Sequence, residues 1–207
     1  MSTKPTIGLI DYGSGNLRSV SKALEAVGAR VLRLEQGPMT GGLDAVVLPG
    51  VGAFGDSVRQ LEKRQLFASL REWLEEGKRF LGVCLGYQLL FETSEESPGI
   101  QGLGLFRGHV QRFDDQSVKV PQIGWNSVHW TRKASTFYPG LPENPFFYFV
   151  HSYYPKPDDT ELVAGYTEYG NRFASAIVTK NLLATQFHPE KSQETGLLLL
   201  RQFLATL

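Results

Sequence analysis

The sequence has a single cysteine, no net charge and no long apolar run. One cysteine, Cys84, excludes an internal disulfide, so we expect a protein of a reducing, cytoplasmic compartment. The 21 basic residues are balanced by 21 acidic ones, which leaves no excess charge of the kind that nucleic-acid binding needs. No apolar run approaches the roughly 20 residues that span a bilayer, and too few apolar residues precede Asp11 for a signal peptide. We therefore expect a soluble protein that binds neither nucleic acid nor membrane.

What the sequence does contain is typical of a globular protein. Its 207 residues are 42% hydrophobic and 20% charged, a balance that argues against disorder. A chain of this length buries roughly 70% of its unfolded surface without a metal or a disulfide. Because we find no repeat, linker or low-complexity tract, we expect one domain over residues 1–207.

The first half of the chain alternates strand and helix patterns. Short apolar runs predict strands at 6–11, 29–34, 45–48 and 79–83. Helical spacing of apolar residues predicts helices at 17–27, within 54–77 as one or two helices, and at 85–92. Such alternation with short connections indicates a parallel sheet with helices on both faces.

The second half predicts mostly strands. Short β-rich runs between about 104 and 186 are separated by Pro, Gly, Asn and Asp, and the turn at 179–182 suggests a hairpin. Ser192 can cap a last helix, in which Leu197, Leu200 and Leu204 share a face. The prediction is an α/β fold with an antiparallel portion added after the fourth strand.

The cysteine lies in the segment GVCLG at 82–86, between an apolar run and a predicted helix. This is the glycine-flanked turn that presents a nucleophile above a sheet, with Cys in place of Ser. A helix N-terminus lowers the pKa of a thiol, and the N–H of Leu85 would face an oxyanion. On this pattern alone a buried, structural Cys84 remains an equal alternative.

A partner for the cysteine comes from the histidines. Among His109, His129, His151 and His188, only His188 has a carboxylate two residues on, Glu190. In an extended segment these two side chains share a face, so Glu190 can orient the imidazole and stabilise its charged form. The order Cys, His, Glu disfavours the α/β-hydrolase architecture, in which the acid precedes the histidine.

Two glycine-rich loops follow predicted strands. The loop PGVGAFG at 49–55 could lend an N–H group to an oxyanion, or be an ordinary turn. The loop GSGN at 13–16 lacks the third glycine of a dinucleotide-binding fingerprint, since Arg18 stands there. Asn16 can cap the following helix, or this exposed loop can meet a partner. Because no phosphate-binding loop or metal-ligand spacing is present, we expect no metal and no cofactor.

Taken together, these motifs resemble the class I (triad) glutamine amidotransferases. They are most similar to the branch that forms the glutaminase subunits of imidazole glycerol phosphate synthase. The segments that carry the resemblance span almost the whole chain: DYGSGNLRSV (11–20), LPGVGAFGD (48–56), GVCLGYQLLF (82–91), SEESPGIQGLGL (94–105), PQIGWN (121–126), YFVHSYY (148–154), YGNRFASAI (169–177) and TQFHPEKS (185–192).

The resemblance implies a flavodoxin-like open sheet and a Cys-His-Glu triad. Cys84 would attack the side-chain amide of L-glutamine to form a thioester, His188 would transfer the proton to ammonia, and Glu190 would orient His188. By the same match, the oxyanion hole would come from Leu85 and from the segment Gly50, Val51 and Gly52.

The resemblance also implies how substrate and partner are held. Gln88 and Glu96 would bind the amino-acid end of glutamine, and the backbone around Ser152 and Tyr153 its carboxylate. The ammonia would pass to a cyclase subunit, a (β/α)8 barrel that forms a heterodimer with this chain in histidine biosynthesis. The face toward the cyclase would include Asn16, Arg18, Trp125 and Asn126.

Three other hypotheses remain at this point. A class I amidotransferase serving another acceptor is disfavoured by the segments PQIGWN and FVHSYY. A cysteine hydrolase of the DJ-1/PfpI type usually has its histidine soon after the nucleophile, whereas His188 lies far beyond Cys84. A scaffold without activity has no need of an intact Cys84, His188 and Glu190.

Overall fold

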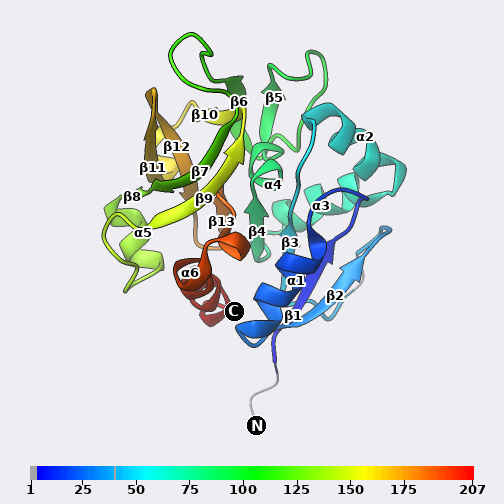
Figure 1. Cartoon of the computed structure of the whole chain (residues 1–207). Helices are drawn as coiled ribbons and strands as arrows, with labels where there is room; N and C mark the ends of the chain where they lie inside the picture. The colour runs from blue at the N-terminus through cyan, green and yellow to red at the C-terminus, as the bar shows by residue number, and fades with distance from the viewer. Residues whose placement is uncertain (1–3, 40) are drawn as a thin grey trace.

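The main element of the structure is an eight-stranded sheet (Figure 1). The computed structural model describes residues 4–39 and 41–207. Parallel strands form one part of the sheet, in the order β2 (Arg30–Leu34), β1 (Thr6–Ile10), β3 (Ala45–Leu48), β4 (Phe80–Val83) and β13 (Leu182–Thr185). Beyond β13, each further strand is antiparallel to its neighbour: β12 (Asn171–Val178), β11 (Val163–Tyr169) and β8 (His129–Trp130).

This strand order confirms the predicted flavodoxin-like sheet with an antiparallel addition. The chain first places β2 on one side of β1 and then β3 and β4 on the other, so the direction of winding reverses between β1 and β3. In open α/β sheets, ligands bind beyond the carboxyl ends of the strands, near such a reversal. The loops that follow β3 and β4 are therefore the expected place for a site.

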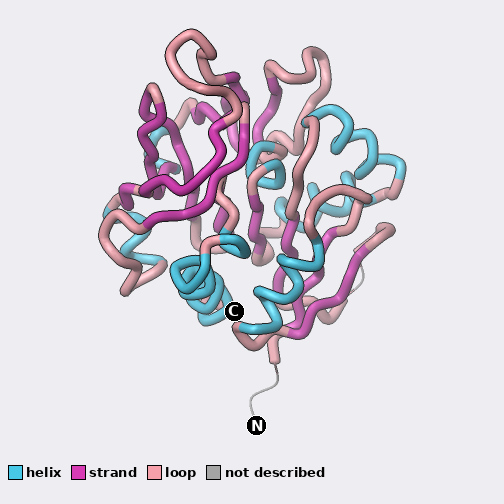
Figure 2. The backbone as a smooth tube through the Cα atoms, viewed as in Figure 1, coloured by secondary structure: helices cyan, strands magenta, loops and turns pink. Residues whose placement is uncertain are grey.

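Helices cover both faces of the sheet, as predicted. Helices α1 (Leu17–Ala26) and α6 (Gln193–Ala205) pack in one core cluster, and α2 (Phe54–Lys63) and α3 (Leu66–Glu75) pack in the other. Strand β3 serves both clusters, because Ala45 and Val47 face the first and Val46 and Leu48 the second. Figure 2 shows the helices flanking the strands. Along the described residues, no helix is both long and apolar enough to cross a bilayer.

Two smaller sheets stand beside the main one. One has the order β10 (Tyr153–Pro157), β6 (Phe106–Arg112) and β5 (Phe91–Ser94). The other is an antiparallel ribbon of β7 (Gln122–Ser127) and β9 (Phe146–His151). Helix α5 (Arg132–Phe137) and short 3-10 turns at Thr160–Leu162 and Pro189–Lys191 complete the elements. A single bridge between Tyr148 and His188 joins the ribbon to the loop after β13.

One local prediction was wrong, and another holds only in part. The helix expected at 85–92 is only the single turn α4 (Leu85–Gln88), because Phe91–Ser94 leaves it to pair with β6. Ser192 stands at the start of α6, but its hydroxyl makes no capping bond. It donates instead to the His188 carbonyl oxygen at 2.6 Å and accepts from the Tyr148 N–H at 3.0 Å.

Candidate active site

The loops after three neighbouring parallel strands meet at one edge of the main sheet. Strand β3 ends just before Pro49 and Gly50, β4 just before Cys84, and β13 just before Gln186. Because β4 lies between β3 and β13, the fold places Cys84 between the glycine loop and the segment that carries His188.

Cys84 occupies a strained turn between β4 and α4. Its φ of 54° and ψ of −104° lie outside the usual regions for L-residues, and such strain tends to gather at active sites. A Cβ on Gly86 would lie only 1.8 Å from the Leu48 carbonyl oxygen, so the turn requires glycine there. The cysteine is nearly buried, at 5% exposed. Since α4 has four residues, the helix dipole at the thiol is limited to one turn of N–H groups.

His188 and Glu190 form a buried pair in the loop after β13. The ring Nδ1 lies 2.7 Å from Glu190 Oε1, and the two side chains are 3% and 4% exposed. The His188 N–H donates to the Tyr148 carbonyl oxygen at 2.9 Å, which holds the backbone of the pair. Nε2 is buried and has no hydrogen-bond partner among the described residues. It is therefore the ring nitrogen free to exchange a proton.

Opposing effects set the protonation of His188. Burial disfavours its charged form, but the neighbouring Cys84 and the Glu190 carboxylate outweigh burial and raise the pKa of His188 from 6.5 to about 10. The imidazolium is therefore the favoured form at neutral pH. This is the form that pairs with a cysteine thiolate.

The residues expected to form an oxyanion hole are bonded to one another rather than open to a substrate. The Leu85 N–H donates to the Gly50 carbonyl oxygen over 3.4 Å, so this donor is occupied within the protein. The Ser14 hydroxyl donates to the Val51 carbonyl oxygen and holds the next peptide of the loop. Gly50 cannot carry a side chain, since a Cβ would lie 2.3 Å from the Tyr12 hydroxyl oxygen.

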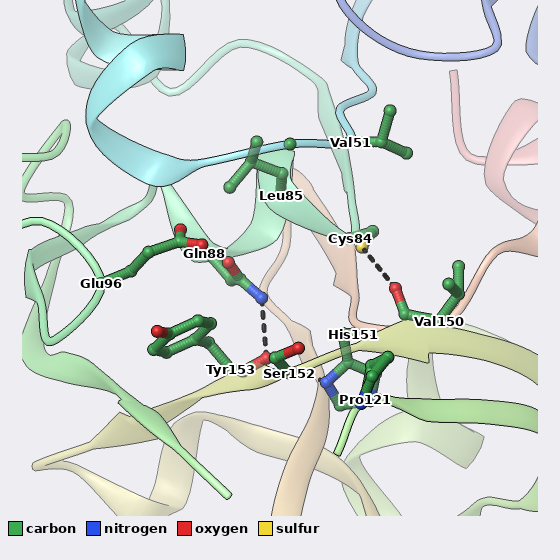
Figure 3. Close-up of a pocket in the computed structure, with 11 residues that line it drawn as sticks. Val51, Cys84, Leu85, Gln88, Glu96, Pro121, Val150, His151, Ser152 and Tyr153 are labelled. Atoms are coloured by element: carbon green, nitrogen blue, oxygen red, sulfur yellow. Dashed lines mark hydrogen bonds between the residues drawn. The ribbon is translucent and has the colours of Figure 1, made fainter.

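A cavity of about 340 Å³ opens beside Cys84 (Figure 3). Small-molecule sites typically start at roughly 300 Å³. The residues that line it come from the loop after β3, from α4 and the segments near it, and from the junction of β9 and β10: Val51, Gly52, Cys84, Leu85, Gln88, Glu96, Pro121, Val150, His151, Ser152 and Tyr153. The lining includes all four residues expected to bind substrate.

Two of these residues face each other across the cavity. The Glu96 carboxylate and the Gln88 amide point toward one another in Figure 3. Glu96 Oε2 accepts from the Phe54 N–H at 2.7 Å, and Gln88 Nε2 donates to the Tyr153 carbonyl oxygen at 2.8 Å. Burial raises the pKa of Glu96, helped by Asp56 and opposed by the Phe54 N–H.

Sequence reasoning missed two polar residues of the site. Gln186 is fully buried, and its Nε2 lies 3.6 Å from Cys84 Sγ. His151 lines the cavity, and its Nδ1 lies 2.8 Å from the Tyr153 carbonyl oxygen. Gln186 precedes His188 by two residues, the same spacing that identified Glu190, so the face shared by alternate residues was the available signal. His151 has no carboxylate neighbour in sequence that could have singled it out.

Within residues 4–39 and 41–207, no three His, Cys, Asp or Glu side chains are grouped as a metal site requires. The reactive groups at this edge of the sheet are thus a thiol, an imidazole paired with a carboxylate, and backbone N–H donors. This set suits nucleophilic attack on an acyl carbon.

A family model described as "Glutamine amidotransferase class-I" matches residues 8–207. The chain belongs to the class I glutamine amidotransferase family. The resemblance found from the sequence motifs is therefore confirmed, and the DJ-1/PfpI hypothesis is set aside.

Comparison with individual relatives shows to which group within this family the chain belongs. It is 50% identical over 196 residues to "Imidazole glycerol phosphate synthase subunit HisH" of Aquifex aeolicus, covering 94% of each chain. It is 47% identical to the protein of the same name from Thermosynechococcus vestitus, covering 97% of each chain. For the Pyrococcus furiosus HisH, the identity is 45%, covering 95% of this chain and 97% of the relative. The amidotransferase is thus a member of the HisH group.

Solved structures agree on the fold. A structure titled "Crystal structure of glutamine amidotransferase" matches with a TM-score of 0.75 at 20% identity, covering 97% of each chain. "Structure of PurLQS from Thermotoga maritima" matches with a TM-score of 0.78 at 18% identity, covering 98% of this chain and 99% of the other. At these identities the likeness concerns the fold alone.

The residues expected on the partner face of this amidotransferase lie in two places. Asn16 caps α1 by accepting from the Ser19 N–H at 3.2 Å, and both Asn16 and Arg18 are exposed. Trp125 on β7 is 47% exposed, whereas Asn126 is half-buried and donates to the Glu168 carbonyl oxygen at 2.9 Å. The structure therefore shows a local structural role for Asn16 and Asn126.

Proposed function

We propose that this amidotransferase is the glutaminase subunit of an imidazole glycerol phosphate synthase. It hydrolyses L-glutamine to glutamate and ammonia and passes the ammonia to a separate cyclase subunit, which forms imidazole glycerol phosphate and aminoimidazole carboxamide ribotide. The observation that carries the proposal is the buried His188–Glu190 pair next to a strained cysteine that lines an open cavity. Membership of the HisH group gives the acceptor reaction.

In the first half-reaction, the Cys84 thiolate attacks the side-chain amide carbon of glutamine. The C–N bond breaks and the imidazolium of His188 gives its proton to the departing ammonia, which leaves a γ-glutamyl thioester on Cys84. Glu190 keeps the proton-exchanging Nε2 turned away from itself, because Nδ1 is committed to Glu190 Oε1 at 2.7 Å.

In the second half-reaction, water replaces ammonia. Neutral His188 takes a proton from the water as its oxygen attacks the thioester carbon, and the C–S bond breaks to release glutamate and the thiolate. Both half-reactions use the same pair of groups. They need no redox partner.

The oxyanion of each half-reaction requires donors that the resting loop withholds. The Leu85 N–H is bonded to the Gly50 carbonyl oxygen. Rotation of the Gly50–Val51 peptide would remove this carbonyl and turn the Val51 N–H toward the oxygen that becomes the oxyanion. Gly50 and Gly52 give this segment its freedom, since Gly52 has a φ of +109°. The loop of residues 49–52 is therefore the proposed switch between slow and fast hydrolysis.

The cavity fits the two ends of an amino acid. Glu96 and the carbonyl end of the Gln88 amide would accept the ammonium group of glutamine, and the backbone near Ser152 and Tyr153 would meet its carboxylate. The side-chain amide would then extend to Cys84 at the other side of the lining. The substrate roles of these residues follow from the family match and their place in the cavity.

The cyclase would dock on the outer face of the β7–β9 ribbon, termed here the ribbon face and made of Ile123, Trp125, Phe146 and Tyr148. The first three are 62%, 47% and 59% exposed, an unusual concentration of large apolar groups at a surface. Trp125 packs edge-on against Tyr148, with ring centroids 6.2 Å apart. Aromatic anchors of this kind are favoured in interfaces.

Co-expression with a cyclase subunit tests the function as a whole. We expect the isolated chain to hydrolyse glutamine slowly, and the complex with its nucleotide substrate to hydrolyse it much faster. High activity that does not depend on the partner would contradict the proposed switch. If the complex forms no cyclase product when glutamine is the source of ammonia, the acceptor assignment is contradicted.

Cys84→Ser tests the nucleophile in the same complex. An alcohol next to His188 is far less ionised than a thiol, so we expect glutaminase activity to fall by at least about 1000-fold. Binding of the cyclase should be unchanged, as measured by co-purification, because Cys84 is nearly buried. Turnover close to that of the wild type would show that another residue is the nucleophile.

A further inference from the structure

A chain of hydrogen bonds runs from the cavity wall to the sulfur of Cys84. The Tyr153 carbonyl oxygen lies 2.8 Å from His151 Nδ1 and 2.8 Å from Gln88 Nε2. Gln88 Nε2 also donates to Gln186 Oε1 at 3.1 Å, and Gln186 Nε2 lies 3.6 Å from Cys84 Sγ. Both glutamines are buried, and Gln186 has no exposed surface.

The Tyr153 carbonyl oxygen fixes the direction of the bonds in this chain, because it can only accept from His151 and from Gln88. Burial lowers the pKa of His151 to about 3, with the Tyr153 carbonyl opposing and His188 adding to the shift. The ring is therefore neutral, and Nδ1 carries the hydrogen that it donates to Tyr153. Because a carbonyl oxygen only accepts, Gln88 must also turn its Nε2 toward Tyr153.

The same logic orients Gln186. The second N–H of Gln88 requires an acceptor, which is Gln186 Oε1. The amide nitrogen of Gln186 is then the end that faces sulfur. An inverted Gln186 would place its amide nitrogen against the amide nitrogen of Gln88, so that two donors would face each other, and it would place an amide oxygen against the sulfur of Cys84.

We propose that Gln186 is a positioning residue that stabilises the thiolate of Cys84 through its amide N–H. A donor gains more from an anionic sulfur than from a neutral thiol, and burial strengthens the interaction further. The Gln186 amide is buried and already in place beside Cys84, whereas the oxyanion donors become available only after the loop of residues 49–52 moves. This inference rests on the proposed function, since it assigns a role in activating the same thiol.

Gln88 connects this donor to the substrate. Both of its N–H groups are used within the protein, so only its Oε1 is available to a ligand. An ammonium group bound between Gln88 and Glu96 would donate to Oε1 and polarise the amide. Each following hydrogen bond in the chain would then strengthen. Occupation of the cavity thereby favours the thiolate before the oxyanion loop moves.

The test is Gln186→Met in the full chain, which keeps a similar side-chain volume and removes the donor. Iodoacetamide alkylates the single cysteine without forming an oxyanion, so its rate against pH reports the thiolate alone. We expect the pH midpoint of alkylation to rise by about one unit. In the complex with the cyclase, kcat for glutamine should fall by about 10-fold with little change in KM.

Matched variants separate this role from a general loosening of the core. Gln202→Met removes a half-buried amide of α6, which donates to the Pro139 carbonyl oxygen at 2.7 Å, and should leave the alkylation profile unchanged. Gln88→Met should raise KM and shift the midpoint upward by a smaller amount. Gln186→Glu, nearly the same shape as the wild-type residue, should shift it upward further, because a carboxylate beside a thiolate disfavours the anion.

The outcomes are decisive in either direction. An unchanged alkylation midpoint in folded Gln186→Met and Gln186→Glu would overturn the inference, whatever happens to glutaminase activity. An equal shift in Gln202→Met would overturn it as well. A wild-type complex that is alkylated normally but does not hydrolyse glutamine would refute the proposed function. The alkylation profiles would still test the bond from Gln186 to Cys84.

Discussion

At the scale of single residues, the chemistry depends on how burial and two neighbouring groups set the protonation of His188. The raised pKa means that activity should persist through the alkaline range and fall only as pH rises through the pKa of the imidazolium. Glu190→Gln removes one cause of the rise, so the alkaline limb of kcat/KM should move to lower pH. A profile of glutaminase activity between pH 6 and 11 checks this.

The same substitution has a consequence for stability with a defined sign. A raised histidine pKa stabilises the fold fully below the unfolded value of 6.5 and progressively less as pH rises through the folded value. Glu190→Gln lowers the pKa of folded His188, so the stabilisation that comes from charged His188 should disappear at a lower pH than in the wild type. Unfolding free energies measured by urea titration across this pH range check the shift. An alkaline limb that stays in place in Glu190→Gln would mean that Glu190 does not act on His188.

The triad candidates could be found from sequence because their signals are local. Glycines two residues either side of Cys84, and a carboxylate two residues after His188, are patterns within five residues. Gln186 has the same spacing to His188, but this spacing did not single it out, because an amide is neither an acid nor a base. Its partner Cys84 also comes close only when β4 and β13 pair. The closed state of the oxyanion loop was equally hidden, since it depends on hydrogen bonds from Leu85 and Ser14 to the backbone of Gly50 and Val51.

At the scale of elements, the turn between β4 and α4 is the feature that fixes the nucleophile. Gly86→Ala would drive a Cβ to 1.8 Å from the Leu48 carbonyl oxygen, which is backbone and cannot move aside. We expect a loss of unfolding free energy of about 3 kcal/mol or more, measured by urea titration. Gly41→Ala is the matched control, because a Cβ there meets nothing within 4 Å. Equal effects of the two changes would show that the turn is not constrained.

The alternation of strands and helices was predictable because β1, β3 and β4 are short apolar runs, each followed by a glycine-containing turn. The segment after Cys84 was not. Its apolar residues Leu89, Leu90 and Phe91 are all buried, which suits a helix or a strand equally. The pairing of Phe91 with Phe106 on β6 decides for a strand, and this partner lies outside the local pattern that the prediction used. Tertiary pairing thus overrode local propensity.

At the scale of the whole molecule, the ribbon face and the active site are parts of one structure. Strand β9 alternates exposed or half-buried residues with buried ones, so Phe146 and Tyr148 face outward while Phe147 and Phe149 enter the core. The backbone of Tyr148 is bonded to that of His188. A partner seated on the ribbon face would therefore contact the strand whose backbone is bonded to the proposed general acid and base. We propose this backbone bond as the path from docking to catalysis.

Trp125→Ala tests the ribbon face as the docking surface. The loss of a central, exposed aromatic group should weaken cyclase binding by about 10-fold or more, measured as Kd by calorimetry. Leu32→Ala is the control, because Leu32 is also exposed, at 37%, but lies on the edge strand β2, away from the ribbon (Figure 1). If the partner acts through the bond between Tyr148 and His188, Trp125→Ala should still reach the wild-type glutaminase rate at saturating cyclase. A lowered maximal rate would instead mean that Trp125 itself takes part in activating the glutaminase. An unchanged Kd would place the cyclase on another face.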